Sequence, residues 1–551
     1  ETTYEYTGMG KIAKETAPDG SVKTWAYDRF GREIVSSVPW AEAGDKVTYT
    51  TYRDQTQADP DILTQWVTLT ATAAELWRAD YTYVEENHVR RVEKRTTALG
   101  EENVRLEVKE SWLGTAPNVY ARGRLKMKQG MDGIQTHYFY EETDQYGALY
   151  KVTAETRIAG ESVPGLSSRK VTYVSGQGNN MRYEQYARLA DGAWSMTDAS
   201  SYEYDVENRW VKRTRANGRV YERMMTCCGP LWERDENGVT TSYSYNTARQ
   251  LVETIRSAVT DGETMITPET ITSYTRDALG KITSLRRDAG PMTTVESREY
   301  DLLGRLIRET DILGRTTVRS YSGDGLVETV TTPAGATLIT RKSPSGTVVR
   351  RYGTGQQDIL YTVEATAEGI RTTEAVPGGE GGEPRVVTGS STVNGFGELV
   401  RIAAANTLNG ENVRTLAYDD KGRLIREQLA DMAPTLYAYD AFGNRTRAIV
   451  ALEDEPTILN SRITDYAYVA ESREDGIYRL VSITSYTSSG TPVLQKQAAL
   501  LSALSSVLAG KTVMTDPRGQ DTVEWTEYGG GSVRLQKKTV PGVGSVALTR
   551  V

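Results

Sequence analysis

The sequence predicts an all-β protein made of short hairpins that follow one another along the chain. Three observations carry this prediction. The 551 residues include 33 tyrosines but only 4 phenylalanines, and they include 50 glycines. The tyrosines recur in pairs spaced two residues apart. A turn phrase of tyrosine, aspartate, two variable residues and glycine recurs at intervals of about 21 residues.

The tyrosine pairs indicate strands. They stand at 4–6, 81–83, 138–140, 202–204, 243–245, 437–439 and 466–468. Residues i and i+2 of a strand share one face of a sheet, so each pair sets two rings side by side. The Thr, Val and Ile residues around them also favour strands. A tyrosine buries its ring while its hydroxyl reaches a polar partner, which predicts half-wet faces rather than a thick apolar core.

The turn phrase is clearest at 25–35, 298–321 and 415–445. Its aspartate can accept hydrogen bonds from downstream backbone N–H groups, and its glycine can adopt a positive φ. The arginine that often follows is expected to pair with an acidic residue on a neighbouring strand. The residues of this repeat signature are Tyr27, Asp28, Gly31, Arg32, Tyr204, Asp205, Tyr300, Asp301, Gly304, Arg305, Tyr418, Asp419, Gly422, Arg423, Tyr439, Asp440 and Gly443.

Two further features recur with the phrase. Three of the four phenylalanines, Phe30, Phe396 and Phe442, directly precede a turn glycine, which predicts a packing slot repeated from unit to unit. A second turn follows about ten residues later, as in "APDG" at 17–20, "RANG" at 215–218, "DILG" at 311–314 and "DPRG" at 516–519. Turn, strand, turn and strand make one repeat into one hairpin. The last of these turns predicts a strand at 521–528.

The repeats predict one region, residues 1–551, rather than several globular domains. They are clear at 1–35, 200–350 and 415–450, and degenerate or interrupted at 45–200 and 355–410. A period of about 21 residues gives about 50 strands, and open sheets rarely exceed ~10 strands without curling or splitting. Propeller blades would carry their own signature, such as a Trp-Asp dipeptide, which is absent. A spiral wall around a hollow is therefore predicted, and the degenerate stretches are either wall or a cap.

Two irregular stretches interrupt this pattern. "AALLSALSSVLAG" at 498–510 is too short and too serine-rich to span a bilayer, and it predicts a brief helix or a buried strand. "PGGEGGEP" at 377–384 is expected to be an exposed flexible loop between strands, because it lacks the helix and lysine of a phosphate-binding loop.

Composition and motifs exclude several functions. The net charge of −8 argues against a nucleic-acid binder, and no apolar run is long enough for a membrane span. Cys227 and Cys228, the only cysteines, are expected to be small side chains near a turn, since two ligands alone make no zinc site. Neither His88 nor His137, placed in polar strand-like stretches, has evident catalytic or metal-binding partners. We therefore expect no enzyme activity, no cofactor and no metal.

The phrases at 25–35, 298–321 and 415–445 closely resemble the Rhs/YD-repeat family, which includes bacterial Rhs proteins, the C component of insecticidal toxin complexes, wall-associated proteins and, more distantly, teneurins. The resemblance implies an all-β fold in which YD/RHS-repeat hairpins form a spiral, hollow, barrel-like shell, or cocoon. It implies a non-catalytic shell that encapsulates or helps deliver a C-terminal toxin or effector in a bacterial polymorphic toxin used in interbacterial competition.

The same resemblance implies partners and a location. The cargo lies inside the shell, N-terminal delivery or plug domains accompany it, and the protein is secreted or held at the bacterial cell surface. The alternative is an adhesion or assembly module that binds surface glycans or proteins through the outside of the barrel.

The chain departs from the toxins at their self-cleavage motif. "TDPRGQ" at 515–520 matches that motif only in part, so Asp516 is not expected to act as an aspartyl protease. We expect the chain to be shell wall alone and a piece of a longer protein.

Overall fold

The computed structural model describes residues 2–40, 44–57, 60–70, 72–261, 264–378, 386–406, 410–430, 432–451, 457, 460–487, 489–503, 508–528, 534–542 and 544–550. Within these residues it contains 45 strands and one short 3₁₀ turn, η1 (Gln145–Gly147). The prediction of an all-β fold is confirmed.

The first part of the chain forms twenty-five strands, which are β1 (Thr3–Tyr6), β2 (Ile12–Thr16), β3 (Val22–Tyr27), β4 (Glu33–Pro39), β5 (Asp45–Tyr52), β6 (Ile62–Leu69), β7 (Glu75–Glu86), β8 (Val89–Ala98), β9 (Arg105–Trp112), β10 (Leu125–Gln129), β11 (Gln135–Glu142), β12 (Tyr150–Arg157), β13 (Ser168–Val174), β14 (Asn180–Arg188), β15 (Trp194–Tyr204), β16 (Trp210–Arg215), β17 (Val220–Met225), β18 (Pro230–Arg234), β19 (Thr240–Tyr245), β20 (Leu251–Arg256), β21 (Val259–Asp261), β22 (Thr264–Thr267), β23 (Thr270–Arg276), β24 (Ile282–Ala289) and β25 (Met292–Tyr300).

The second part forms twenty strands, which are β26 (Leu306–Thr310), β27 (Thr316–Tyr321), β28 (Val327–Thr331), β29 (Thr337–Lys342), β30 (Val348–Tyr352), β31 (Ile359–Thr366), β32 (Gly369–Val376), β33 (Val386–Val393), β34 (Leu399–Asn406), β35 (Gly410–Tyr418), β36 (Leu424–Leu429), β37 (Thr435–Tyr439), β38 (Arg445–Ala451), β39 (Ser461–Arg473), β40 (Gly476–Tyr486), β41 (Pro492–Ala503), β42 (Leu508–Thr515), β43 (Asp521–Tyr528), β44 (Arg534–Val540) and β45 (Gly544–Arg550).

Forty-three of these strands form one antiparallel sheet in which each strand pairs with the next along the chain. The exceptions, β21 and β22, form a separate two-stranded hairpin inserted between β20 and β23, which pair with each other. The sheet is not divided into blades, so the propeller alternative is wrong. Because every strand pairs with its sequence neighbour, the topology is the simplest that a chain of hairpins can adopt.

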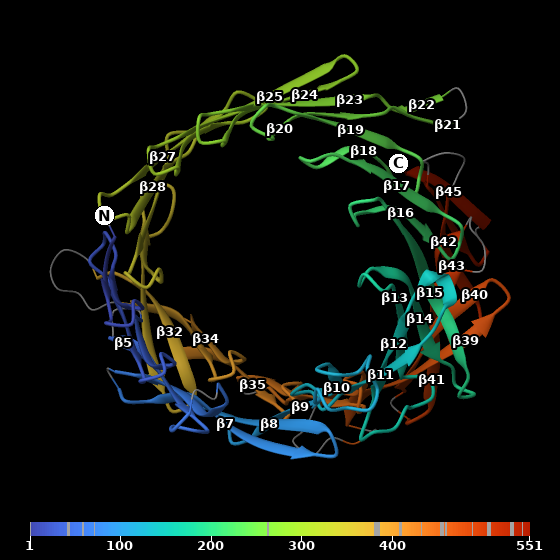
Figure 1. Cartoon of the computed structure of the whole chain (residues 1–551), viewed down its shortest axis with the longest axis horizontal. Helices are drawn as coiled ribbons and strands as arrows, with labels where there is room; N and C mark the ends of the chain where they lie inside the picture. The colour runs from blue at the N-terminus through green and yellow to red at the C-terminus, as the bar shows by residue number, and fades with distance from the viewer. Residues whose placement is uncertain are drawn as a thin grey trace.

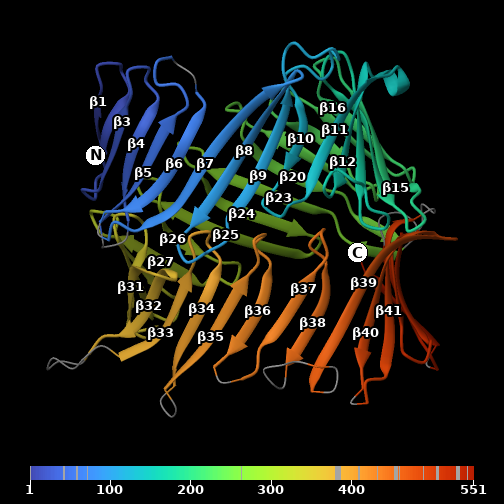
Figure 2. The same cartoon turned by 90° about the horizontal axis from the view of Figure 1, so that it is seen from below.

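The sheet winds as a spiral. Figure 1 shows the strands as a ring around a central space, and Figure 2 shows the second circuit lying beside the first along the ring's axis. The turn between β33 and β34 lies against the turn between β8 and β9, so one circuit takes about 25 strands. Among the described pairings, β1 bonds only to β2 and β45 only to β44. The shell is therefore an open spiral, and hydrogen bonding does not close it into a barrel.

A wall one sheet thick explains the large exposed surface. The chain exposes 30825 Å², whereas a compact monomer of its mass exposes about 20,000 Å². The described core consists of small separate clusters, such as Val67 with Leu69 and Leu76, and Tyr478 with Ala498 and Val513. Barrels of 16–18 strands already leave a channel that side chains do not fill. A circuit of about 25 strands therefore surrounds open space.

The stretches that depart from the repeat are wall and not a cap. Strands β5–β14 and β31–β34 continue the same sheet, and most of them are longer than most strands of the clear repeats: β7 has 12 residues and β26 has 5, although β10 also has only 5. The serine-rich stretch at 498–510 supplies the end of β41 and the start of β42, so the strand alternative is confirmed. Its predicted burial is not, because among the described residues of this stretch only Ala498 is buried and Leu501 is 45% exposed. The strand predicted at 521–528 is β43. Most of the "PGGEGGEP" stretch, from 379 on, lies outside the described residues.

Candidate functional site

Each turn phrase folds into the same corner, and the turn between β25 and β26, at Asp301, is an example. Its Oδ1 accepts the backbone N–H groups of Leu303 at 3.0 Å and of Arg305 at 2.8 Å. Gly304 has a φ of +74°, which lets the chain reverse. The second carboxylate oxygen, Oδ2, accepts the Nε–H of Arg305 at 2.7 Å. One aspartate thus fixes the turn and the arginine at its end.

The other signature aspartates do the same. Each Oδ1 accepts the N–H groups two and four residues on, at Asp28, Asp205, Asp419 and Asp440. Each Oδ2 accepts from the fourth residue's side chain, namely Arg32, Arg209, Arg423 and, with an amide in place of a guanidinium, Asn444. The turn glycines Gly31, Gly422 and Gly443 have φ values of +76°, +78° and +79°. In the Asp205 corner, Asn208 takes the glycine position at +60°.

The signature tyrosine ties each corner to the preceding strand. The Tyr300 hydroxyl donates to the carbonyl oxygen of Ile282 at 3.1 Å. The same bond joins Tyr27 to Ile12, Tyr204 to Asn180, Tyr418 to Leu399 and Tyr439 to Leu424, at 2.8–3.0 Å. A half-buried ring therefore ends in a satisfied hydroxyl.

The signature arginine links one hairpin to the next. The Arg305 guanidinium lies over the Tyr321 ring at 4.4 Å, and that of Arg32 lies over Tyr52 at 4.3 Å. Arg423 lies over Tyr439 and donates to the Asp440 carbonyl oxygen at 2.7 Å. The expectation of an acidic partner on a neighbouring strand is wrong, because the carboxylate belongs to the arginine's own turn. What the arginine finds on its neighbour is a ring and a carbonyl.

The three phenylalanines do not share a packing slot. Phe30 is exposed, and its ring contacts the guanidinium groups of Arg29 and Arg32. Phe396 instead lies 3.8 Å from the guanidinium of Arg105, a residue of the other circuit. No ring contact is recorded among the described residues for Phe442. The prediction of a shared slot was wrong because the surroundings of the phenylalanine side chain depend on which residues of the neighbouring circuit lie beside it. A local repeat does not determine these residues.

The two circuits meet along a seam, formed here by residues 98–105 of the first and 393–398 of the second. The N–H of Gly395 donates to the Leu99 carbonyl oxygen at 2.6 Å, and the N–H of Leu99 donates to that of Leu76 at 2.9 Å. A Cβ atom on Gly395 would lie 2.2 Å from the Leu76 oxygen. Only glycine permits this approach of two backbones.

A buried charge pair crosses the seam. Arg105 Nη2 donates to Glu398 Oε2 at 2.6 Å, and their side chains are 7% and 17% exposed. Asn394, 1% exposed, donates to Glu398 Oε2 at 2.9 Å and to Glu101 Oε1 at 2.6 Å. The Arg105 guanidinium and the Glu398 carboxylate are paired with each other and hydrogen-bonded, so the burial of both charges is tolerated. Removing either partner would leave an uncompensated buried charge.

Asn394 and Glu398 stand where other corners have aspartate and arginine. Asn394 Oδ1 still accepts the N–H groups of Phe396 and Glu398, so the turn is unchanged. However, the residue four positions after Asn394 is the acidic Glu398, and it pairs with Arg105, 293 positions away in the sequence. Sequence reasoning missed this contact, although the exchange of Asp…Arg for Asn…Glu in "NGFGE" at 394–398 is the signal that marks it.

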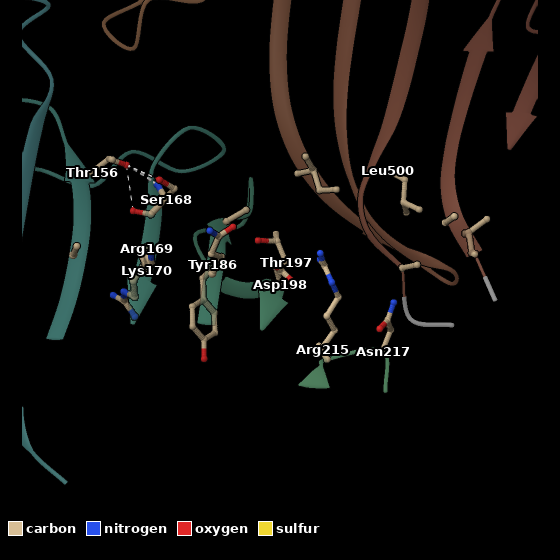
Figure 3. Close-up of a pocket in the computed structure, with 18 of the residues that line it drawn as sticks. Thr156, Ser168, Arg169, Lys170, Tyr186, Thr197, Asp198, Arg215, Asn217 and Leu500 are labelled. Carbon is tan, nitrogen blue, oxygen red and sulfur yellow. Dashed lines mark hydrogen bonds between the residues drawn. The ribbon is translucent and has the colours of Figure 1, made fainter. Parts of the chain in front are cut away.

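Farther along the seam both circuits line an open cavity of about 750 Å³. Figure 3 shows Thr156, Ser168, Arg169 and Lys170 on strands of the first circuit, and Leu500 on a strand of the second. Ser168 and Thr156 are hydrogen-bonded at 2.7 Å. Burial and a hydrogen bond to Glu184 raise the pKa of Tyr186, which also lines the cavity, to about 12. One wall is polar and cationic, and the other, with Leu501 and Leu508, is aliphatic.

Features with catalytic or metal-binding chemistry are scattered. Among the described residues, no three His, Cys, Asp or Glu side chains gather as a metal site. His137 lies on β11 and contacts Gln135, whereas His88 lies in the turn after β7, not in a strand, and contacts Thr115. Asp516 Oδ1 accepts the N–H groups of Arg518 and Gln520, which is the ordinary corner arrangement. Across the described residues, no helix has the length and apolar character to cross a membrane.

Comparison with known protein families identifies one match, which includes a corner. The RHS Repeat family model matches residues 300–337, which begin with the Tyr300 corner and end in β29. No curated protein matches the chain.

Two solved structures are similar over nearly the whole chain. The crystal structure of TcdB2-TccC3 is 11% identical, with a TM-score of 0.22, and covers 98% of this chain and 39% of that one. The structure of the Photorhabdus luminescens Tc holotoxin pore is 10% identical, with a TM-score of 0.24, and covers 100% and 41%. The chain thus spans about two fifths of their length, and TM-scores this low do not establish a shared fold.

The corner hydrogen bonds lead to a first prediction. Replacement of Asp419 by alanine removes the acceptor for the N–H groups of Lys421 and Arg423 and for the Arg423 guanidinium, and we expect a loss of about 1–3 kcal/mol in unfolding free energy. Asp420→Ala, at the exposed neighbouring position, is the matched control and should change it by less than about 0.5 kcal/mol. Urea denaturation followed by tryptophan fluorescence measures both. Equal effects of the two substitutions would contradict the role of the corner.

The corner carboxylates also predict acid sensitivity. Burial alone would raise the pKa of Asp28, but hydrogen bonds from Arg32 and Phe30 outweigh it, so the pKa lies below its usual value. Hydrogen bonds from Arg305, opposed by desolvation, likewise lower the pKa of Asp301. An unfolded aspartate has a pKa of about 3.9. The corners therefore stabilise the fold above about pH 4 and lose that contribution as pH falls further. Stability that stays constant between neutral pH and pH 3 in denaturant titrations would contradict this.

The seam gives a third prediction. Gly395→Ala should push the circuits apart, because its methyl group would collide with the Leu76 oxygen, and overpacking of this kind costs about 1–3 kcal/mol. Gly323→Ala is the control, since a Cβ there meets nothing within 4 Å. Spin labels at Asn103 and Ala367, which line one cavity across the seam, report the separation. We expect a longer, broader distance distribution for Gly395→Ala alone; unchanged distances in both variants would show that the seam tolerates a side chain there.

Proposed function

The chain is an RHS-repeat protein, and from this premise we propose that it is the non-catalytic wall of a container for a polypeptide cargo, a toxin or effector of a bacterial polymorphic toxin. The observation that carries the proposal is the open space inside each circuit. A protein that binds by its outer surface has no need of a lumen, whereas a container requires one.

The width of the lumen supports a polypeptide occupant. A circuit of about 25 strands, 23 of them in the sheet, spaced ~4.8 Å apart, has a diameter of roughly 35 Å between opposite backbones, and strand tilt increases this. A compact domain of about 100 residues has a radius of gyration near 13 Å. Such a domain would touch the wall on all sides, and an unfolded chain of the same length would have to be compressed. The lumen therefore suits one small cargo.

The wall's chemistry supports the same role. The charged groups of the corners are occupied by the turns themselves, as are those of Asp301 and Arg305. Corners whose charged groups are already occupied in this way offer few free partners to a cargo and so do not hold it tightly. We further infer that the wall has no catalytic residue. From the resemblance to bacterial Rhs proteins we infer that the protein works outside the cell or at its surface, with delivery or plug domains at its rims.

A second candidate function is adhesion to glycans or proteins. A depression of about 420 Å³ near the C-terminal strands is lined by Trp525, Asp475, Lys511 and Glu527. An aromatic face with carboxylates beside it is chemistry suited to a sugar ring. Both carboxylates are, however, already paired with lysines, Asp475 with Lys511 and Glu527 with Lys537. Container function is therefore the better supported proposal, and glycan binding abolished by Trp525→Ala would favour the second.

Protease protection tests the container. A Gly/Ser-rich segment carrying trypsin sites, fused after Val551, serves as a cargo of known sequence. A protease of about 220 residues has a radius of gyration near 17 Å and does not pass easily into such a lumen. We expect cleavage of the fused segment to be at least about tenfold slower than cleavage of the free segment, from the restricted access alone.

Opening the seam provides the control for that experiment. Arg105→Ala, which leaves the buried Glu398 carboxylate without its charge partner across the seam, should restore fast cleavage. Arg95→Ala, whose side chain is 64% exposed, should not. If the fused segment is cut as fast as the free one in the intact protein, the container proposal fails, whatever the state of the seam.

A further inference from the structure

The two cysteines occupy one hairpin corner, the turn between β17 and β18. Thr226 takes the place of the corner aspartate, Cys227 and Cys228 take both variable positions, and Gly229 takes the glycine position. Arg209 Nη1 donates to the Thr226 carbonyl oxygen at 3.0 Å, as Arg423 does to that of Asp440. The dithiol is therefore built into the chain of contacts that links successive hairpins.

The corner is tighter than the others. The N–H and Oγ1–H of Thr226 both donate to the Gly229 carbonyl oxygen at 2.8 Å, so the loop closes one residue earlier than at Asp301. Gly229 has a φ of +148°, and a Cβ there would lie 2.4 Å from the Tyr245 hydroxyl. This hydroxyl donates to the Pro230 carbonyl oxygen at 3.0 Å. The residues on either side of the two cysteines, Thr226 and Gly229, are therefore both held in place.

The sulfurs are already in contact. Sγ of Cys227 and Sγ of Cys228 are 2.9 Å apart, both thiols are free, and Cys227 is exposed. The chain has no other cysteine, so within one molecule each thiol has only the other as a partner. The hydrogen bond with Cys227 raises the pKa of the Cys228 thiol. Cys227, at the surface, is therefore placed to react first.

We propose that Cys227 and Cys228 form a modification site, a reversible vicinal disulfide made by exchange with a low-molecular-weight disulfide such as oxidised glutathione. The Cys227 thiolate attacks one sulfur of the oxidant, a mixed disulfide forms, and one glutathione thiolate leaves. The Cys228 thiolate then attacks the Cys227 sulfur, the Sγ–Sγ bond forms, and the second glutathione thiolate leaves. The protein loses two hydrogen atoms, and the oxidant gains two electrons and two protons.

The ring geometry makes this bond labile. Adjacent cysteines close an eight-membered ring through the peptide that joins them, and strained, exposed disulfides have higher reduction potentials than structural ones. The bond would therefore form under oxidising conditions and open again in a reducing compartment. Formation must alter the backbone between Thr226 and Gly229, the part of the corner that receives Arg209. This inference stands independently of what the shell contains.

Mass spectrometry of the folded full chain tests the inference. After exposure to oxidised glutathione, the peptide holding both cysteines should be lighter by two hydrogen atoms, with no glutathione attached, and dithiothreitol should restore it. Cys227→Ser and Cys228→Ser are matched variants that keep one thiol each. Each variant should retain one glutathione, because it has no second thiol to displace it.

Four outcomes would overturn the proposal. The first is a wild-type protein that retains one or two glutathione groups, because the second thiol should displace them. The second is a wild-type protein that keeps two free thiols while the single variants react, because this would show that ring closure is sterically excluded. A lack of reaction in all three proteins would show that the corner hides its thiols, and disulfide-linked dimers would assign them to an interface.

Discussion

A wall one sheet thick cannot bury a core, and the rest of the structure depends on that constraint. In a globular domain, apolar burial is the dominant favourable term of folding. Here the apolar clusters are small and separate, so each hairpin has to be defined where it turns. The aspartate of each corner does this, because one carboxylate holds two backbone N–H groups and the side chain at the end of the turn. Gly304 and its equivalents supply the backbone conformation that brings these groups together.

Contacts between hairpins pass from one neighbour to the next. Tyr300 reaches back to the strand of Ile282, and Arg305 reaches forward to the ring of Tyr321. Such a chain of nearest-neighbour terms resembles a solenoid more than a globular domain, and its stability is approximately a sum over repeats. The ladder of hydrogen bonds sets the strands side by side, but nothing in it sets one circuit against the other. The Arg105–Glu398 pair and the Gly395 contact provide that second restraint.

The sequence predicted the parts of the fold that are local. Strand and turn positions followed from Asp, Gly and paired Tyr, since each turn is satisfied within five residues, and β43 falls where the "DPRG" turn placed it. The partner of Arg32 was predicted wrongly, because turn geometry folds this side chain back onto Asp28 before a neighbouring strand can offer an acid. The contact of Phe396 with Arg105 was beyond reach, since it depends on how many strands complete a circuit. That number is set by accumulated twist and strand length, which no single repeat encodes.

The seam is also where the wall is easiest to part. Separating two neighbouring strands breaks the backbone hydrogen bonds along their whole length, as between β39 and β40, which pair over ten residue positions. Separating the circuits at residues 98–105 breaks one backbone hydrogen bond, from Gly395 to Leu99, and the side-chain bonds around Glu398. Each is a local contact, and the hairpin ladder is untouched. A spiral of this kind can therefore widen between circuits while every hairpin remains folded, which a barrel closed by hydrogen bonds cannot do.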